Sequence, residues 1–370
     1  MPNQRIFYAV QAVAIAPRGA GYLHPDYVVH GLQSVGMSST FTLDQVFEMG
    51  QIEIYENIEE VADIEVTLEK VIDGYNLMYD LATQGACKTG VVGASKKRSD
   101  VYLAVFDDSQ DHATGVPQTV CMNSGMYVSS VAYSYSVDGS ATESVTLVGN
   151  DRFWNTTAAT TDVQNPSHTW SGIYYGQDPA SATQMANNVG TGNITGSGGF
   201  TGSDSPLSGV VRRTDVLLGA GQSTVPAEVD LNKGSADAVD NSSNRRIQSI
   251  SISTDFGQEN IQELGRFGPY HRYATFPIEV TSEFEVVSAS GDLVSVSGTA
   301  PNLQNRTIII KDNAGTSIDL GTKNKLSSVS YSGGDTGGGN ATVTYSYSNF
   351  NVLKVDGGSG VYYRQPYNFQ

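Results

Sequence analysis

The sequence predicts a mainly β protein with long polar loops. The composition is rich in turn and strand formers, with 40 Gly and 20 Tyr among 370 residues, and only 16% of residues are charged. Several segments also alternate apolar and polar residues with a period of two, as half-buried strands do. Gly favours turns, whereas aromatic and β-branched residues favour strands. At about 100 to 200 residues per domain, the length indicates two or three domains.

The first apolar segment is the run from Ile6 to Ile15, which Gln11 interrupts. It is too short to span a membrane and lacks a convincing signal-cleavage site. We therefore expect a buried strand here, in a chain that is neither exported by a classical signal nor inserted in a membrane.

An internal duplication organises the rest of the chain. Residues 32–50 (LQSVGMSSTFTLDQVFEMG) resemble residues 247–265 (IQSISISTDFGQENIQELG). In the same order, IEVTLE at 64–69 meets IEVTSE at 278–283, and YVSSVAYS at 127–134 meets KLSSVSYS at 325–332. Val145 and Thr146 then meet Val343 and Thr344. Matches that keep their order over such a length indicate two copies of one unit.

The duplication divides the chain into three parts. We expect a first domain over 1–154, with the N-terminal strand, and a second over 245–370, with a C-terminal extension. Between them, 155–244 is dominated by small polar residues and Gly, as in GTGNITGSGGFTG at 190–202. A long segment of this kind is usually functional or a domain of its own, so we expect an inserted β-rich and loop-rich surface domain.

Within each copy, alternation predicts the strand faces. Val35, Met37, Phe41 and Leu43 are expected on one face of a strand. In a second strand Ile64, Val66 and Leu68 face one side, and Glu65, Thr67 and Glu69 face the other; the second copy repeats this with Ile278, Val280, Phe284 and Val286 against Glu279, Thr281, Glu283 and Glu285. One flanking helix is predicted where Val71, Tyr75, Met78 and Leu81 recur at helical spacing before Gly85.

The sequence lacks the patterns of common catalytic sites. It contains no nucleophile elbow, no phosphate-binding loop and no zinc-protease motif, and its five histidines are scattered. Cys87 and Cys121 are too few for a disulfide framework, so we expect reduced structural thiols. We predict no enzyme activity, no metal and no cofactor.

The charge is strongly acidic. Asp and Glu number 38 against 21 Lys and Arg, a difference of 17 negative charges, which leaves no basic surface for tight DNA binding. From Asp44 to Asp80 there are eleven acidic residues and one basic residue, Lys70. These carboxylates form either a solvated face or a sheet face that is presented to a partner of known charge.

Three segments carry a family resemblance. Residues 46–74, 131–154 and 261–286 resemble the tail tube proteins of tailed bacteriophages. The resemblance implies two tandem antiparallel β-sandwich or half-barrel domains with a flanking helix. In that family six domains close a ring around the channel for DNA ejection, and rings stack into a tube. Two such domains per chain favour a ring of three chains with pseudo-sixfold symmetry over a hexamer.

The resemblance also implies roles for particular residues. We expect Glu65, Glu69, Glu283 and Glu285 to face the lumen, where they would repel DNA that passes without binding. Tyr55, Glu56 and Asn57 are candidates for stacking between rings. The implied partners are further copies of the chain, a sheath or terminator, the baseplate and the tape measure, in a virion tail assembled in the host cytoplasm, without a membrane.

Two alternatives stay open. A baseplate hub or other tail-end ring can also carry two tube-like domains. A surface module that binds carbohydrate or a receptor is the second, because Trp170, Tyr174 and Tyr175 could form either a stacking platform or a core.

Overall fold

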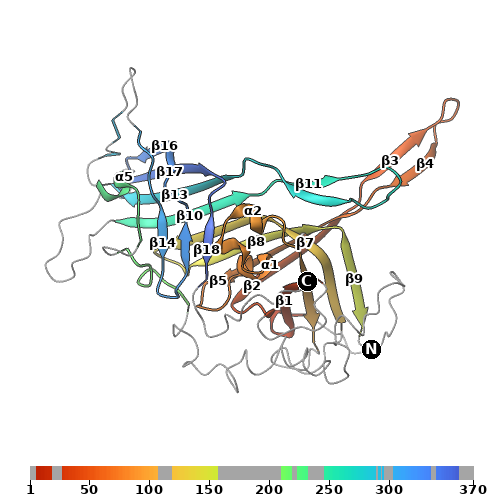
Figure 1. The fold of residues 1–370 in the computed structure, drawn as a ribbon, viewed down its shortest axis with the longest axis horizontal. Coiled ribbons are helices and arrows are strands. Elements are labelled where there is room, and N and C mark those ends of the chain that lie inside the picture. Colours follow the sequence, from red (N-terminus) through yellow and green to blue (C-terminus); the bar gives the residue numbers. More distant parts are fainter. Residues whose placement is uncertain are drawn as a thin grey trace.

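The protein is mainly β, as predicted, and is seen here in a computed structural model (Figure 1). The structure describes residues 6–18, 27–106, 119–156, 210–218, 223–231, 246–288, 291–292, 294–295, 303–334 and 339–357. Three short helices and two 3-10 turns, at Tyr8–Val10 and Ala86–Lys88, accompany the strands in these ranges.

A long antiparallel sheet forms the body of the molecule. Its strands lie in the order β16-β17-β13-β10-β7-β8-β5-β2. Their bounds, in the same order, are Lys325–Ser332, Thr342–Phe350, Glu279–Val287, Ile247–Asp255, Thr119–Ser136, Thr142–Gly149, Asp63–Val71 and Leu32–Thr40. The copies predicted from the sequence therefore share one continuous sheet, joined where β10 pairs with β7.

The strand order repeats. The first unit runs β7-β8-β5-β2 and the second runs β16-β17-β13-β10. Irregular register recurs at matching positions: between Leu32 and Ser34 and between Ile247 and Ser249, then between Val128 and Ser130 and between Leu326 and Ser328. We call residues at the same ladder position in the two units counterparts.

The ladders correct part of the sequence alignment. Val35 pairs with Leu68, and its counterpart Ile250 pairs with Phe284. Leu68 and Phe284 are thus counterparts, so the aligned IEVTLE and IEVTSE segments are offset by two residues. In the neighbouring ladders Leu68 pairs with Val145 and Phe284 with Tyr345, so Val145 meets Tyr345 and not Val343. A period of two cannot distinguish registers that differ by two residues.

The predicted alternation holds in the central strands. Ile64, Val66 and Leu68 are buried in β5, and Val280, Phe284 and Val286 are buried in β13. These side chains belong to the main hydrophobic core, which lies on one side of the sheet. In β2, Val35 and Met37 are half-buried, but Phe41 and Leu43 lie beyond the strand and are exposed, which corrects their predicted place on its face.

Two hairpins extend from the same end of the sheet (Figure 1). In the first unit β3 (Leu43–Phe47) pairs with β4 (Ile54–Glu59), and in the second unit β11 (Gln258–Ile261) pairs with β12 (His271–Ala274). Every residue of β3 and β4 is exposed.

Three further strands join the sheet through the first half of β7. Here β1 (Gln11–Pro17) pairs with β6 (Ser99–Val105), β6 pairs with the first half of β7, and β7 pairs with β9 (Asp151–Thr156). The buried N-terminal strand expected over Ile6–Ile15 is confirmed only from Gln11 onward, as β1, because Tyr8–Val10 form a 3-10 turn and Ile6 is exposed. Cys87 and Cys121 are both buried and free.

The predicted flanking helix is shorter than its sequence pattern. Val71 is the last residue of β5, and α1 comprises only Met78–Thr83, followed by the short α2 at Val91–Ala94. Val71 completes the strand because it pairs with Thr142. Gln84 and Gly85 adopt left-handed conformations at the C-terminal end, as the predicted stop requires. No helix in the described ranges is long and apolar enough to cross a membrane.

Parts of the 155–244 segment pack on the body. Val211 N–H donates to Ile72 O, and Thr224 pairs with Ile309 of β14 (Ile309–Lys311). The small sheet runs β14-β15-β18, with β15 at Ser317–Asp319 and β18 at Lys354–Asp356. The helix α5 (Ala227–Leu231) lies beside the second unit. Trp170, Tyr174 and Tyr175 lie outside the described residues.

Candidate functional site

The side of the long sheet opposite the main core is polar, and we call it the polar face. Glu65 and Glu69 of β5 and Glu283 of β13 are exposed on it, and Glu285 is half-buried. All four predicted lumen residues therefore lie on one face of one sheet. Glu69 and Glu285 are counterparts, because Glu69 pairs with Ser34 and Glu285 with Ser249.

Hydroxyl groups surround these carboxylates. Ser249 Oγ donates to Glu285 Oε2 at 3.2 Å, and Ser346 Oγ donates to Glu283 Oε1 at 3.1 Å. On the first unit Thr67 Oγ1 donates to Glu65 Oε1 at 3.4 Å. These three hydroxyls direct their donors to the carboxylates and so do not offer them to a phosphate.

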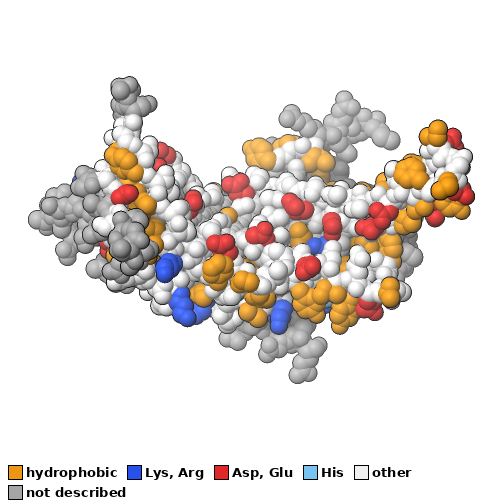
Figure 2. Space-filling view, turned by 90° about the horizontal axis from the view of Figure 1, so that it is seen from above, with side chains coloured by type: hydrophobic (Ala, Val, Ile, Leu, Met, Phe, Trp, Pro, Cys, Tyr) orange, Lys and Arg blue, Asp and Glu red, His pale blue; other side chains and the backbone are white. Residues whose placement is uncertain are grey.

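Few basic residues belong to the strands of the polar face. Figure 2 shows acidic side chains spread over this face of the molecule and along the projecting hairpin. Within the eight strands of the long sheet, Lys325 at the start of β16 is the one Lys or Arg on this face. Its side chain is assigned to this face because the next residue, Leu326, is buried on the core side and successive side chains alternate. Lys70, the other basic residue in these strands, is fully buried.

The first hairpin carries the three predicted stacking residues. Tyr55, Glu56 and Asn57 all lie on β4 and are exposed. Large apolar side chains are exposed on the same hairpin and its loop, among them Phe47, Met49 and Ile52. An exposed apolar patch rimmed by charges is typical of a protein–protein contact.

The second hairpin shows how such an arm attaches to a sheet. It lies over β7 of the first unit, where Tyr127 Oη and His271 Nδ1 are 3.0 Å apart. Arg272 forms an ion pair with Asp63 and donates to Asn150 Oδ1, and Gln258 Nε2 donates to Val128 O at 2.9 Å. Burial lowers the pKa of His271, and nearby Arg98 lowers it further, which favours the neutral ring.

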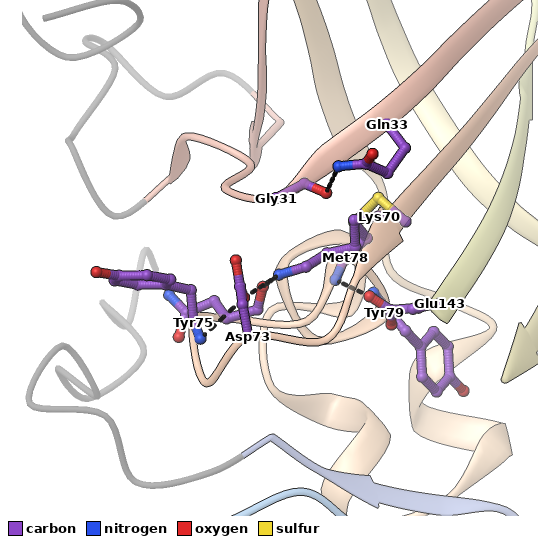
Figure 3. A network of polar contacts seen from close by, with 9 residues as sticks. Gly31, Gln33, Lys70, Asp73, Tyr75, Met78, Tyr79 and Glu143 are labelled. Atoms are coloured by element: carbon purple, nitrogen blue, oxygen red, sulfur yellow. Dashed lines mark hydrogen bonds and ion pairs between the residues drawn. The ribbon is translucent and has the colours of Figure 1, made fainter. Parts of the chain in front are cut away.

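A buried polar network lies on the core side (Figure 3). Glu143 of β8 accepts hydrogen bonds from the backbone N–H groups of Met78 and Tyr79 at 2.6 and 3.1 Å, and from Tyr133 Oη at 3.0 Å. Lys70, directly opposite Glu143 in the ladder, donates to Asp73 Oδ1 and Asn76 O. The network fixes α1 to the sheet at its N-terminal end.

Burial sets the electrostatics of this network. Desolvation raises the pKa of Glu143, while Lys70 and the two backbone donors oppose the shift. Desolvation, with Lys70 acting in the same direction, lowers the pKa of His30 to about 4. Among the described residues no three His, Cys, Asp or Glu side chains gather so that they could hold a metal ion.

Sequence reasoning missed two groups of residues. Glu143 lies on a strand whose apolar alternation hides one buried carboxylate, and Lys70 was counted only as the lone cation in an acidic stretch. His271 and Arg272 could have been found, because they align with Glu56 and Asn57 in the duplicated hairpin.

No family profile and no curated protein match this chain. Several solved chains are similar to part of this chain. A chain of the sixfold-symmetrised anti-feeding prophage baseplate has a TM-score of 0.30 at 11% identity, covering 42% of this chain and 99% of that one. A chain of the extended sheath–tube complex of an extracellular contractile injection system has a TM-score of 0.32 at 10% identity, covering 42% of this chain and 95% of that one. A chain of a native gene transfer agent virion has a TM-score of 0.25 at 12% identity, covering 40% of this chain and 95% of that one.

Proposed function

We propose that this chain is a structural, non-catalytic subunit of a phage-type tail tube, in which stacked rings enclose a channel for DNA. The observation that carries the proposal is the junction between the two units. Two copies of one four-stranded unit already lie edge to edge in a single sheet, where β10 pairs with β7. The chain thus contains one finished example of the contact that a ring would repeat.

The two outer edges of the sheet support ring formation. Among the described residues, β2 pairs only with β5 and β16 pairs only with β17. Open edges invite further strand pairing, and a head-to-tail contact satisfies every edge when the ring closes. Since β2 is the counterpart of β10 and β16 the counterpart of β7, the edges are complementary. Three chains then supply six units.

The polar face gives the ring a suitable lining. In this proposal the polar face turns inward, so that Glu65, Glu69, Glu283 and Glu285 line the channel. Carboxylates repel phosphates, and at physiological salt the repulsion extends about 8 Å, which prevents adhesion to the wall. The apolar core side, with residues 210–218 and 223–231 packed near it, then lies outside, where a sheath, a terminator or other tail proteins would make contact.

Electron microscopy of the purified full-length chain tests the function. We expect hollow tubes of stacked rings, or rings that stack as the concentration rises. Single rings that never stack would favour a baseplate hub. Monomers at all concentrations would rule out both assemblies and leave a surface binding module.

A further inference from the structure

The chain carries the same sheet edge in a joined and an open form. Inside the chain, Ile252 of β10 pairs with Tyr133 of β7, and Ser253 pairs with Ala132. Their counterparts are Met37 and Ser38 on β2, and Tyr331 and Ser330 on β16. Met37 is half-buried and Tyr331 is 53% exposed, although both lie on the core side of the sheet.

The Phe that follows the edge strand is likewise buried at the joined edge and exposed at the open edge. Phe256 follows β10, is fully buried and packs near Tyr79, and its N–H donates to Ser129 O at 2.7 Å where the register of β7 shifts. Phe41 follows β2 at the equivalent position and is 71% exposed. The matching shift on β16 is at Ser327. Phe41 therefore lacks, within the single chain, the buried site that Phe256 occupies.

The hairpins supply a third difference. In the joined edge, His271 of the second hairpin meets Tyr127 on the polar face. Hairpin registers make Glu56 the counterpart of His271, since Val46 pairs with Glu56 and Ile261 with His271. Tyr127 pairs with Val148 and Lys325 with Ser348, so Lys325 is the counterpart of Tyr127. A neutral pair inside the chain thus corresponds to a carboxylate and an ammonium group at the open edges.

The counterparts of a neighbouring internal contact are also chemically complementary. Arg272 forms an ion pair with Asp63 inside the chain. Asn57 is the counterpart of Arg272, and Glu279 is the counterpart of Asp63. An amide can donate to a carboxylate, so this pair also keeps a donor and an acceptor.

Resting on the proposed ring-forming function, we infer that β2 of one chain pairs with β16 of a second copy in the register of the internal junction. Met37 then lies opposite Tyr331 of that copy, Ser38 opposite Ser330, and Phe41 is buried beside Ser327. Glu56 forms an ion pair with Lys325 of that copy, and Asn57 approaches its Glu279. Lys325, the one basic residue that the eight strands place on the polar face, is thereby explained as half of an interface.

The ion pair serves specificity more than affinity. An exposed pair adds little attraction, but two like charges brought together at an interface are strongly unfavourable. The paired strands and Phe41 supply the affinity, and Glu56 with Lys325 selects the partner edge. Reversing one charge should therefore weaken assembly more than neutralising it would.

A charge swap tests the ion pair. Glu56→Lys and Lys325→Glu should each raise the concentration needed for ring assembly by about tenfold or more, measured by analytical ultracentrifugation. The double variant should restore assembly. Glu53→Lys and Lys323→Glu, which reverse exposed neighbours, are the matched controls and should assemble like the wild type. Single reversals that assemble normally, or a double variant as defective as the singles, would overturn the ion pair.

Cysteine pairs test the register. Ser38→Cys with Ser330→Cys should form a disulfide between chains on mild oxidation, since residues directly opposite lie within disulfide range. Ser38→Cys with Ser328→Cys is two residues out of register and should not. Native Cys87 and Cys121 are buried and leave a low background. Wild-type rings with equal cross-linking of both pairs, or only of the control pair, would reject this register but keep the proposed function. A monomeric wild type would overturn both.

Discussion

The two units fill one position of the same sheet in opposite ways. In the first unit Lys70 of β5 pairs with Glu143 of β8. At the counterpart position in the second unit Val286 of β13 pairs with Val343 of β17. All four side chains are fully buried. The sheet therefore does not require the charged pair, because an apolar pair completes the same ladder.

The charged pair instead belongs to the attachment of a helix. Glu143 accepts from the first N–H groups of α1, which have no partner within the helix. Beside the second unit the carboxylate belongs to the helix and not to the sheet. Glu228 of α5 accepts hydrogen bonds from Arg306 and from Tyr347 Oη of the sheet. Repeated sheets can thus hold different helices when a few buried polar residues change.

Breaking the first unit's network should have the largest effect. Glu143→Val removes the buried acceptor of the Met78 and Tyr79 N–H groups and of Tyr133 Oη, while Lys70 keeps its ion pair with Asp73. It should lower the free energy of unfolding by about 3–5 kcal/mol, because buried donors are left without a partner. Adding Lys70→Val makes the position resemble Val286 and Val343 and should recover part of the loss. Urea unfolding of the three proteins measures both steps. A double variant less stable than Glu143→Val would contradict the comparison.

The two aromatic anchors should respond differently. Phe256→Ala empties a fully buried position and should cost about 3–4 kcal/mol. Phe41→Ala, at the counterpart position, should change the stability of the single chain by less than about 0.5 kcal/mol. Thermal and urea unfolding at concentrations below assembly compare them. Equal losses would show that Phe41 is already buried within one chain.

Asp312, beside the second unit, gives the comparison a pH dependence. Desolvation raises the pKa of Asp312 to about 6, although Thr316 and Tyr135 donate to it. A pKa raised by folding adds stability that is complete below the unfolded pKa of 3.8 and is lost as the pH rises through about 6.

Relative to Asp312→Asn, the wild type should therefore gain about 2–3 kcal/mol between pH 7 and pH 3.5. The difference between the two unfolding curves at each pH isolates this carboxyl from the others. A difference that stays constant with pH, or that grows toward pH 7, would contradict the assignment.

The counterpart carboxylates Glu69 and Glu285 should have the smallest effect on stability. Reversing both to Lys should shift the free energy of unfolding by less than about 0.5 kcal/mol each, since both reach solvent on the polar face. Assembled tubes should nevertheless begin to retain DNA, and more strongly at low salt. Asp138→Lys with Asp151→Lys, at exposed positions in a turn and on β9, is the control. Equal DNA retention by both would remove these residues from the channel wall.

Sequence predicted the sheet better than what lies on it. Alternation in β5 and β13 gave the correct faces, because one side of each strand packs on the core. The same period of two placed the aligned segments 64–69 and 278–283 two residues out of register, since apolar residues recur at every second position. The predicted helix began at Val71, but Val71 belongs to β5, where it pairs with Thr142. Glu143 could not be placed in the core from sequence, because its partners Met78, Tyr79 and Lys70 converge only in the fold.

Native mass spectrometry of the purified chain tests the central claim most directly. The account holds that two units per chain lie side by side and that complementary edges close a ring of six units. It therefore predicts a closed species of three chains, together with multiples of three as rings stack. A ring of six chains, or a chain that remains monomeric at every concentration, would contradict it.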